Sequence, residues 1–324
     1  DGIRDDLVTG VQTCALPILM DAMKGCLSCK ACTTYCPVQV DIPSFKAVFY
    51  EQFYFKRLRS FGSWLEGYIG WVMAGYVKWR YRSLFYREVD RQTSGVFLCV
   101  DAFTAFFNID WVREAQGLLE KMGFQVYLLP FEDYGKSLHN QGFLAAFSRV
   151  AKERVTQLQR ITEYGFPIVS LEPSISCLFG DEYPAHVSMD SSLKVHSLQG
   201  FLVQHLDKMS VLKDISKAYV ILGHCIERST DVLAMQQWQQ LFSEVGLTLT
   251  VADVGCCGMA GAYGYQREHR KISRQLYDIS WRSVVQSHDS DQVLVTGLSC
   301  RSQIKRFSGL SAKHPLQILY SVLS

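Results

Sequence analysis

The pattern of apolar and polar positions changes character once along the chain. Between residues 45 and 87, aromatic residues recur at mixed helical spacing with a break near residues 60–63. This predicts a helical hairpin with one wide apolar face. Beyond residue 95, short apolar runs alternate with longer amphipathic stretches. Such alternation is typical of parallel β-sheets with right-handed crossover helices, so we expect open α/β lobes in this part of the chain.

The apolar runs and amphipathic stretches define individual elements. Strands are expected at residues 96–100, 125–129, 167–171, 219–222, 247–252 and 293–296. Helices are expected at residues 111–122, 142–164, 232–245, 267–285 and 315–323. The segment 181–196 has no regular pattern, and no element is assigned to it.

The part of the chain before residue 92 is expected to be helical. One helix begins near Leu19, a cysteine-bearing loop follows, and a second helix starts at Ile42, because Pro43 is tolerated in a first helical turn. We interpret the aromatic face of the hairpin as a core shared with a neighbouring part of the protein. A surface that touches the membrane or a quinone pocket is the alternative.

The loop before Pro37 carries four cysteines with the spacing C-x2-C-x2-C-x3-C. Bacterial ferredoxins use this spacing to hold a [4Fe–4S] cluster through thiolates. The predicted ligands are Cys26, Cys29, Cys32 and Cys36. In ferredoxins with two clusters the fourth cysteine ligates the other cluster, so the assignment of Cys36 is open.

A structural interpretation of the same loop is that its cysteines are small buried hydrophobic residues. That interpretation does not explain the regular spacing. Lys30, Thr33 and Thr34 lie between the cysteines and are not expected in a core. The pattern therefore favours a cluster-binding loop.

The two α/β lobes are expected to be repeats of each other. Aligned by their strand ends, Asp101 of the first lobe corresponds to Cys225 of the second, and Ser174 corresponds to Cys300. The residues after Pro130 correspond to the motif at 255–258. All these positions follow the carboxyl ends of strands, where open parallel sheets bind their ligands. The second lobe thus carries thiols that the first lobe lacks.

The thiols of the second lobe form a second candidate site. Its predicted members are Cys225, Cys256, Cys257 and Cys300. Four thiolates suggest an iron-sulfur site, including a non-cubane one, or a zinc site. Two adjacent cysteines do not easily occupy two corners of one small tetrahedron, which favours a cluster with several irons. Glycines 255, 258 and 261 allow backbone amides to approach an anionic group at a helix N-terminus.

Composition restricts the class of protein further. The chain has 324 residues, 48 % hydrophobic content and a formal net charge of +2, which describes a globular protein and gives no reason to expect a nucleic-acid partner. Its cysteines cluster in motifs instead of forming a disulfide framework, so we expect a cytoplasmic protein, with attachment at the membrane periphery as an alternative. No run reaches the roughly 18 apolar residues of a membrane span.

The domain organisation follows from these observations. Residues 1–18 look like translated sequencing adapter, and we expect the natural sequence to enter near Leu19 with its true N-terminal part missing. Three parts then follow: a helical ferredoxin-type domain with the aromatic hairpin at 19–92, a degenerate α/β lobe at 93–208 and a cysteine-bearing α/β lobe at 209–324.

The motifs resemble a known group of proteins. Cys225, the Cys256-Cys257-Gly258 triplet and Cys300 resemble the cysteine-rich CCG domain of heterodisulfide reductases and of iron-sulfur subunits of glycolate oxidase and anaerobic glycerol-3-phosphate dehydrogenase. The segment from residue 92 onward is similar to the C-terminal half of bacterial FAD-linked oxidases of the D-2-hydroxyglutarate dehydrogenase type. The motifs that carry this similarity lie at residues 101–104, 135–139, 141–144, 255–261 and 299–303. One departure is that Arg301-Ser302-Gln303 follows Cys300, where the pattern has a C-x2-C pair.

The resemblance implies an electron-transfer portion of a flavin-dependent 2-hydroxyacid dehydrogenase of the D-2-hydroxyglutarate or D-lactate type. An FAD-binding domain upstream, missing here, would pass electrons to the [4Fe–4S] cluster, then to the second site and to an acceptor such as a quinone or a carrier protein. The isolated portion is not expected to be active, and the full-length protein is expected to be a homo-oligomer.

Two functions from other classes remain open. The adjacent cysteines could perform thiol-disulfide chemistry, with Cys256 or Cys257 attacking a substrate sulfur. Alternatively, a zinc-stabilised scaffold would only dock partners. Metal analysis separates these alternatives from electron transfer.

Overall fold

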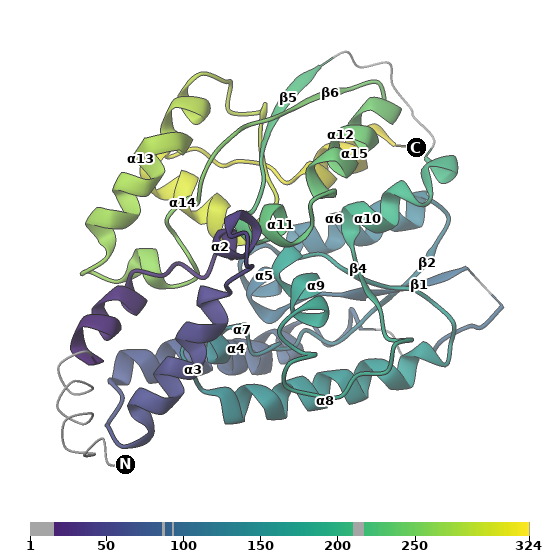
Figure 1. Cartoon of the computed structure of the whole chain (residues 1–324). Coiled ribbons are helices and arrows are strands. Elements are labelled where there is room, and N and C mark those ends of the chain that lie inside the picture. The colour runs from purple at the N-terminus through teal and green to yellow at the C-terminus, as the bar shows by residue number, and fades with distance from the viewer. Residues whose placement is uncertain (1–15, 86–87, 93, 210–216, 324) are drawn as a thin grey trace, which may run out of the picture.

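The computed structural model describes residues 16–85, 88–92, 94–209 and 217–323 (Figure 1). Residues 16–24 are helical. The expectation of a translated adapter at 1–18 falls mostly on residues 1–15, which lie outside the described residues.

The helices of the N-terminal part begin where the sequence indicates. After the short helix α2 (Ala31–Tyr35), α3 (Ile42–Phe55) starts with proline in its first turn and is capped by Asp41, whose carboxylate accepts from the Ser44 amide. Helix α4 (Phe61–Arg80) starts at the predicted break and is capped by Ser60. The two predicted helices are therefore present, but α4 packs mainly on α5 and α7 and α3 on α7 and α8, so they do not form the expected hairpin.

The first lobe contains a parallel sheet of four strands. Its order is β2 (Gln125–Leu128), β1 (Gly95–Cys99), β3 (Ile168–Ser170) and β4 (Val195–Ser197). The first three strands were expected. The fourth lies at the end of the segment to which the sequence assigned no element, because it has only three residues and a polar residue at its centre.

The second lobe repeats this arrangement. Its parallel sheet has the order β6 (Thr248–Val251), β5 (Ala218–Leu222) and β7 (Val293–Val295), so the first strand of each lobe is central and the next two flank it. A parallel bridge between Leu294 and Lys313 occupies the position that β4 has in the first lobe. The topology is compatible with the predicted pair of open parallel-sheet lobes.

Helices connect the strands and cover both sheets. In the first lobe they are α5 (Ala102–Phe107), α6 (Ile109–Lys121), α7 (Lys136–Asn140), α8 (Leu144–Thr162), α9 (Pro173–Gly180) and α10 (Leu198–Val203). In the second lobe they are α11 (Cys225–Thr230), α12 (Ala234–Glu244), α13 (Arg270–Gln286), α14 (Leu298–Ser308) and α15 (Pro315–Val322). The long helices match the predictions; the short helices that directly follow strands were not expected.

The two lobes share one core. Alternate residues of each central strand point to opposite faces. Val96 and Leu98 of β1, and Ile221 of β5, pack with α6, α10, α12 and α15 in a single cluster between the sheets. The other faces are covered separately, by α8 and α9 on the first sheet and by α13 and α14 on the second (Figure 1).

The predicted aromatic face is only partly a core. Ala74 and Val77 of α4 are buried in the shared core, but Trp71 and Trp79 remain 72 % and 68 % exposed. The interpretation of the whole aromatic face as a covered core is therefore wrong for this side of α4 in the described chain. None of the described helices combines the length and the apolar character that crossing a membrane demands.

Candidate functional site

Four cysteines of the second lobe follow the carboxyl ends of its strands. Cys225 is the first residue of α11, just beyond β5. Cys256 and Cys257 come after β6, and Cys300 lies in the first turn of α14, just beyond β7. Because parallel strands end at one edge of the sheet, the topology brings these distant residues together.

The thiols of these four residues lie close enough to shift one another's pKa values. Cys225 interacts with Cys256, Cys256 with Cys257, and Cys257 with Cys300. Interactions with Cys225 and Cys257 hold the pKa of the Cys256 thiol well below its usual value. The same contacts, together with burial, raise the pKa values of Cys225 and Cys257. The group therefore favours one thiolate, on Cys256, stabilised by neighbouring thiols.

Gly258 brings the backbone close to this thiolate. Its amide donates to the Cys256 sulfur at 3.4 Å. Its φ angle is +83°, and a Cβ atom added there would lie 2.5 Å from the Ser273 carbonyl oxygen. Both facts require glycine at this position. The predicted approach of a backbone amide to an anionic group is thus present at one of the three glycines.

Gln303 lies where the resembling pattern has its last cysteine. It is fully buried, and its amide nitrogen donates to the Cys257 carbonyl at 2.7 Å and to the Ser273 hydroxyl at 2.8 Å. Its Oε1 atom is buried without a hydrogen-bond partner among the described residues. The Gln303 side chain therefore holds the backbone of the cysteine pair by a hydrogen bond, at the position where the resembling pattern has a cysteine.

Buried polar residues surround the thiols. Glu227 accepts from Trp238 Nε1 at 3.2 Å and from the Thr296 hydroxyl, and burial raises its pKa to about 7. The amide of His224 donates to Thr296 Oγ1 at 2.9 Å, and burial lowers the pKa of its imidazole to about 4. His224 is thus a buried, neutral residue between the end of β5 and the start of α11.

The N-terminal loop brings three of its four predicted residues together. The pKa of Cys29 is raised by burial and by the charges of Cys26 and Cys32. Cys36 has a different environment, because the backbone amides of Val40 and Val38 lower the pKa of its thiol. Cys36 lies one helical turn beyond Cys32, whose carbonyl accepts from its amide at 3.0 Å, and its assignment as a ligand stays a prediction.

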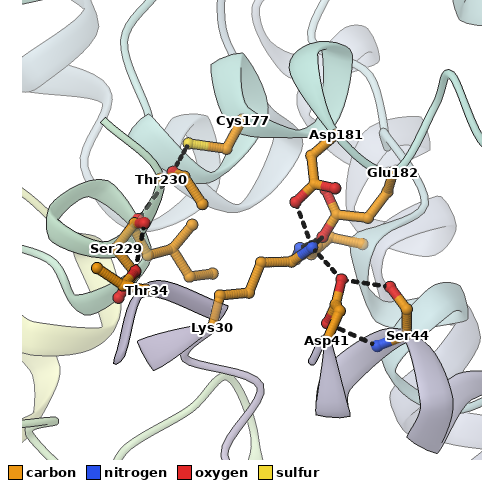
Figure 2. A network of polar contacts seen from close by, with 11 residues as sticks. Lys30, Thr34, Asp41, Ser44, Cys177, Asp181, Glu182, Ser229 and Thr230 are labelled. Atoms are coloured by element: carbon orange, nitrogen blue, oxygen red, sulfur yellow. Dashed lines mark hydrogen bonds and ion pairs between the residues drawn. The ribbon is translucent and has the colours of Figure 1, made fainter. Parts of the chain in front are cut away.

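The two groups of thiols adjoin each other at Cys29. The charge of Cys256 also raises the pKa of Cys29, and Cys29 in turn contributes to the raised pKa of Cys225. Helix α2 packs on α11, and the Thr34 hydroxyl donates to the Ser229 carbonyl at 2.7 Å (Figure 2). The sequence contains no signal for this contact, because it joins segments almost two hundred residues apart.

Lys30 corrects one expectation from the sequence. It was not expected in a core, yet it is only 2 % exposed. Its ammonium group contacts three carboxylates from two places in the chain (Figure 2): Asp41 at 3.0 Å, and the neighbours Asp181 and Glu182, the latter at 3.5 Å. Its backbone is left-handed, with φ +58°. These ion pairs raise the pKa of Lys30 against the effect of burial, and they hold the cysteine loop on α3 and on the end of α9.

The first lobe has carboxylates where the second has thiols. Asp101, which corresponds to Cys225, caps α5 by accepting from the amides of Phe103 and Thr104 at 3.0 and 3.2 Å. Glu172 follows the neighbouring strand, and burial raises the pKa values of both acids. Asp101 thus acts as a helix cap at the position that Cys225 has in the second lobe.

The donor set fits soft metals, but the described residues do not form a complete metal site. Cysteine thiolates select zinc and iron-sulfur clusters. In residues 16–85, 88–92, 94–209 and 217–323, no group of three or more His, Cys, Asp or Glu side chains is arranged so that it could hold a metal ion. The structure thus gathers the predicted residues, while their role as ligands remains a prediction.

Comparison with known proteins relates the chain to dehydrogenases. It is 30 % identical to D-2-hydroxyglutarate dehydrogenase of Haemophilus influenzae over 93 % of its own length, and 29 % identical to the same enzyme of Escherichia coli over 94 %. It is also 28 % identical, over 64 % of its length, to one subunit of the anaerobic glycerol-3-phosphate dehydrogenase of Escherichia coli, and it covers 54 % of that subunit.

The chain spans about a third of the D-2-hydroxyglutarate dehydrogenases that it matches, 35 % of the first and 34 % of the second. No family model matches it. The comparisons therefore establish homology to part of these dehydrogenases.

Proposed function

We propose that this chain is the iron-sulfur electron-transfer portion of a flavin-dependent 2-hydroxyacid dehydrogenase of the D-2-hydroxyglutarate or D-lactate type. Its partners would be an FAD-binding domain and an electron acceptor such as a quinone or a carrier protein. The observation that carries the proposal is the packing of α2, from the N-terminal cysteine loop, on α11, which begins at Cys225; the charges of Cys29 and of Cys256 and Cys225 act on one another across this packing.

The residues of the two groups would have distinct tasks. Cys26, Cys29 and Cys32, with Cys36 as the fourth predicted thiol, would hold a [4Fe–4S] cluster, and Cys225, Cys256, Cys257 and Cys300 would hold a second iron-sulfur or metal site. Iron-sulfur clusters supply one-electron transfer at potentials set by ligands, hydrogen bonds and exposure. Gly258 and Gln303 would orient the second group through the backbone of the cysteine pair.

Homology supports the dehydrogenase class. Nearly the whole chain aligns with proteins named D-2-hydroxyglutarate dehydrogenase, and two thirds of it aligns with part of another dehydrogenase. A portion shared by enzymes with different named substrates suits a task that does not depend on the substrate, and electron transfer is such a task.

A second function is favoured by the state of Cys256. A thiol whose pKa is lowered by neighbouring thiols is a nucleophile at neutral pH, and thiol-disulfide exchange starts from such a thiolate. In this function Cys256 would attack a substrate sulfur and a neighbouring cysteine would resolve the mixed disulfide.

The two functions differ in whether Cys256 and Cys257 are needed to bind iron. The chain would be reconstituted anaerobically, reduced with dithionite and reoxidised with a dye while its visible absorption is followed. Electron transfer predicts a reversible change that is diminished in the Cys256→Ser/Cys257→Ser variant. An unchanged iron content in that variant, together with loss of disulfide reduction, would favour thiol-disulfide chemistry. Zinc without iron or sulfide would leave only the scaffold.

A further inference from the structure

A cavity of about 440 Å³ lies between the N-terminal helices and the loop that follows the cysteine pair. Its walls come from the cysteine loop at residues 26–28, from α3, from the start of α4, from the end of α7 and from residues 260–269. Small-molecule sites have volumes in this range and often form where several elements meet. A ligand here would touch segments next to both thiol groups.

The buried end of the cavity carries a cation without an ion-pair partner. Lys46 is only 9 % exposed, and in the described part of the chain its ammonium group makes one hydrogen bond, to the Cys26 carbonyl at 2.8 Å. It lies 5.4 Å from the centre of the Tyr50 ring. An ammonium group has three protons to donate, so capacity remains for a ligand. The charge of Glu66 acts on this ammonium group without forming an ion pair with it, so an anion bound closer to Lys46 would offset more of the cost of its burial.

A second donor is also unpaired. Tyr263 is 9 % exposed, and its hydroxyl is buried without a hydrogen-bond partner among the described residues. Its ring stacks on His269 with a centroid distance of 4.0 Å, which fixes the side chain in the wall of the cavity. Buried hydroxyls normally have partners, so this one indicates an absent ligand or water.

The acidic groups of the cavity already have partners. The Glu66 carboxylate lines the cavity and accepts from Gln141 Nε2 at 2.6 Å and from Gln266 Nε2, one bond at each oxygen. Glu268 is largely exposed and lies beside His269. Arg267 is exposed in the same lining and has no ion pair within the described residues. The groups free to bind a ligand are therefore donors and cations.

We propose that this cavity binds a small molecule that bears a carboxylate or phosphate group, with Lys46 and Tyr263 as donors at its buried end and Arg267 at its mouth. The helices α4 and α13 begin at this cavity, and their N-termini add favourable partial charge for an anion. The proposal does not require electron transfer, because none of the three ligand-binding side chains belongs to a thiol group, although the cavity is also lined by Cys26.

Titration calorimetry with glutarate, inorganic phosphate and glutaramide tests the proposal. Glutaramide matches glutarate in size but carries no charge. Saturable binding of glutarate or phosphate with one site per chain, and no comparable binding of glutaramide, is the expected result. Glutarate alone would identify a carboxylate ligand, and phosphate alone a phosphate ester.

Variants locate the site. Tyr263→Phe and Arg267→Gln should each weaken anion binding about tenfold, while Lys152→Gln, an exposed lysine on α8, should leave it unchanged. Lys46→Gln should abolish binding. Because Lys46 also supports the cysteine loop, this variant could misfold, and in that case the Tyr263→Phe and Arg267→Gln variants test the proposal. Absence of saturable binding, equal binding of glutaramide, or binding that no cavity variant weakens would overturn the proposal.

Discussion

The ammonium group of Lys30 lies 3.0 Å from the Asp41 carboxylate and joins the cysteine loop to the first turn of α3. The same group also contacts Glu182, which is as deeply buried as Lys30 itself. One buried cation thus holds a loop, a helix start and the end of α9 in a single arrangement (Figure 2).

Replacing this cation should destabilise the protein strongly. Lys30→Met keeps the length of the side chain but leaves Asp41 without its cation and Glu182 with Lys136 as its remaining partner. Removal of one partner of a fully buried ion pair costs about 3 to 5 kcal/mol, which is the upper bound here. Urea denaturation measures the change. Lys24→Met is the matched control, because its pair with Asp21 is exposed and is worth at most about 1 kcal/mol. Equal stability of the two variants would contradict the assigned role of Lys30.

His314 should make the free energy of unfolding depend on pH in the acidic range. It is buried, it caps α15 by accepting from the Leu316 amide at 3.1 Å, and burial lowers its pKa to about 3. Because the folded pKa lies below the unfolded value near 6.5, neutral His314 stabilises the fold above pH 6.5, and this contribution is lost as the pH falls toward 3. Between pH 7 and pH 4.5 the loss is about 2 to 3 kcal/mol.

The His314→Asn variant isolates this contribution. Asparagine keeps a helix-capping oxygen but does not titrate, so the free energy of unfolding should fall less between pH 7 and pH 4.5 than in the wild type. His288→Asn serves as the control, because His288 is exposed. If His314→Asn and the wild type showed the same pH dependence, burial of a neutral histidine would not be the cause.

Gly258 should tolerate no side chain. Gly258→Ala would place a Cβ atom 2.5 Å from the Ser273 carbonyl oxygen in a left-handed backbone, and a cost on the order of 3 kcal/mol is expected. Gly246→Ala is the control: Gly246 has a similar φ of +75° with nothing within 4 Å, so only the backbone cost of about 1 kcal/mol applies. Thermal unfolding compares them; similar shifts for both would show that the close approach at Gly258 is relaxed without cost.

Cys29 should influence both thiol groups. After reconstitution, Cys29→Ser is expected to change the electron paramagnetic resonance signals of the loop cluster and of the second site, because Cys29 lies beside Cys256 and Cys225. Cys36→Ser should change only the first, since Cys36 lies in a nest of backbone amides instead. If the electron paramagnetic resonance signal of the second site were the same in Cys29→Ser as in the wild type, the proposed proximity of the two thiol groups would be contradicted.

Much of this arrangement could be predicted from local patterns, and the rest could not for physical reasons. The five-residue apolar run of β1 and the long amphipathic stretch of α8 are local signals, whereas β4 has three residues around His196 and gives almost none. The partners of Lys30 at Asp181 and Glu182 lie about 150 residues away, so a lysine that looks solvated in sequence is buried by tertiary contacts.

The candidate site shows the same division. The position of cysteines after strand ends predicted that Cys225, Cys256, Cys257 and Cys300 share one edge, and in the structure their thiols shift one another's pKa values. The approach of Cys29 to that group depends on the packing of α2 against α11, which no pattern within either helix encodes. Gln303 was visible only as a departure from a motif, and its bonds to the cysteine pair required the folded chain.

The most direct test of the proposed electron transfer is the iron and acid-labile sulfide bound per chain after anaerobic reconstitution. If both thiol groups hold clusters, the chain should bind iron and sulfide in equal amounts, and at least as much of each as one [4Fe–4S] cluster contains. The Cys225→Ser and Cys300→Ser variants should each bind less iron and sulfide than the wild type. Colourless protein free of sulfide, or an iron content that none of these cysteine substitutions lowers, would contradict it.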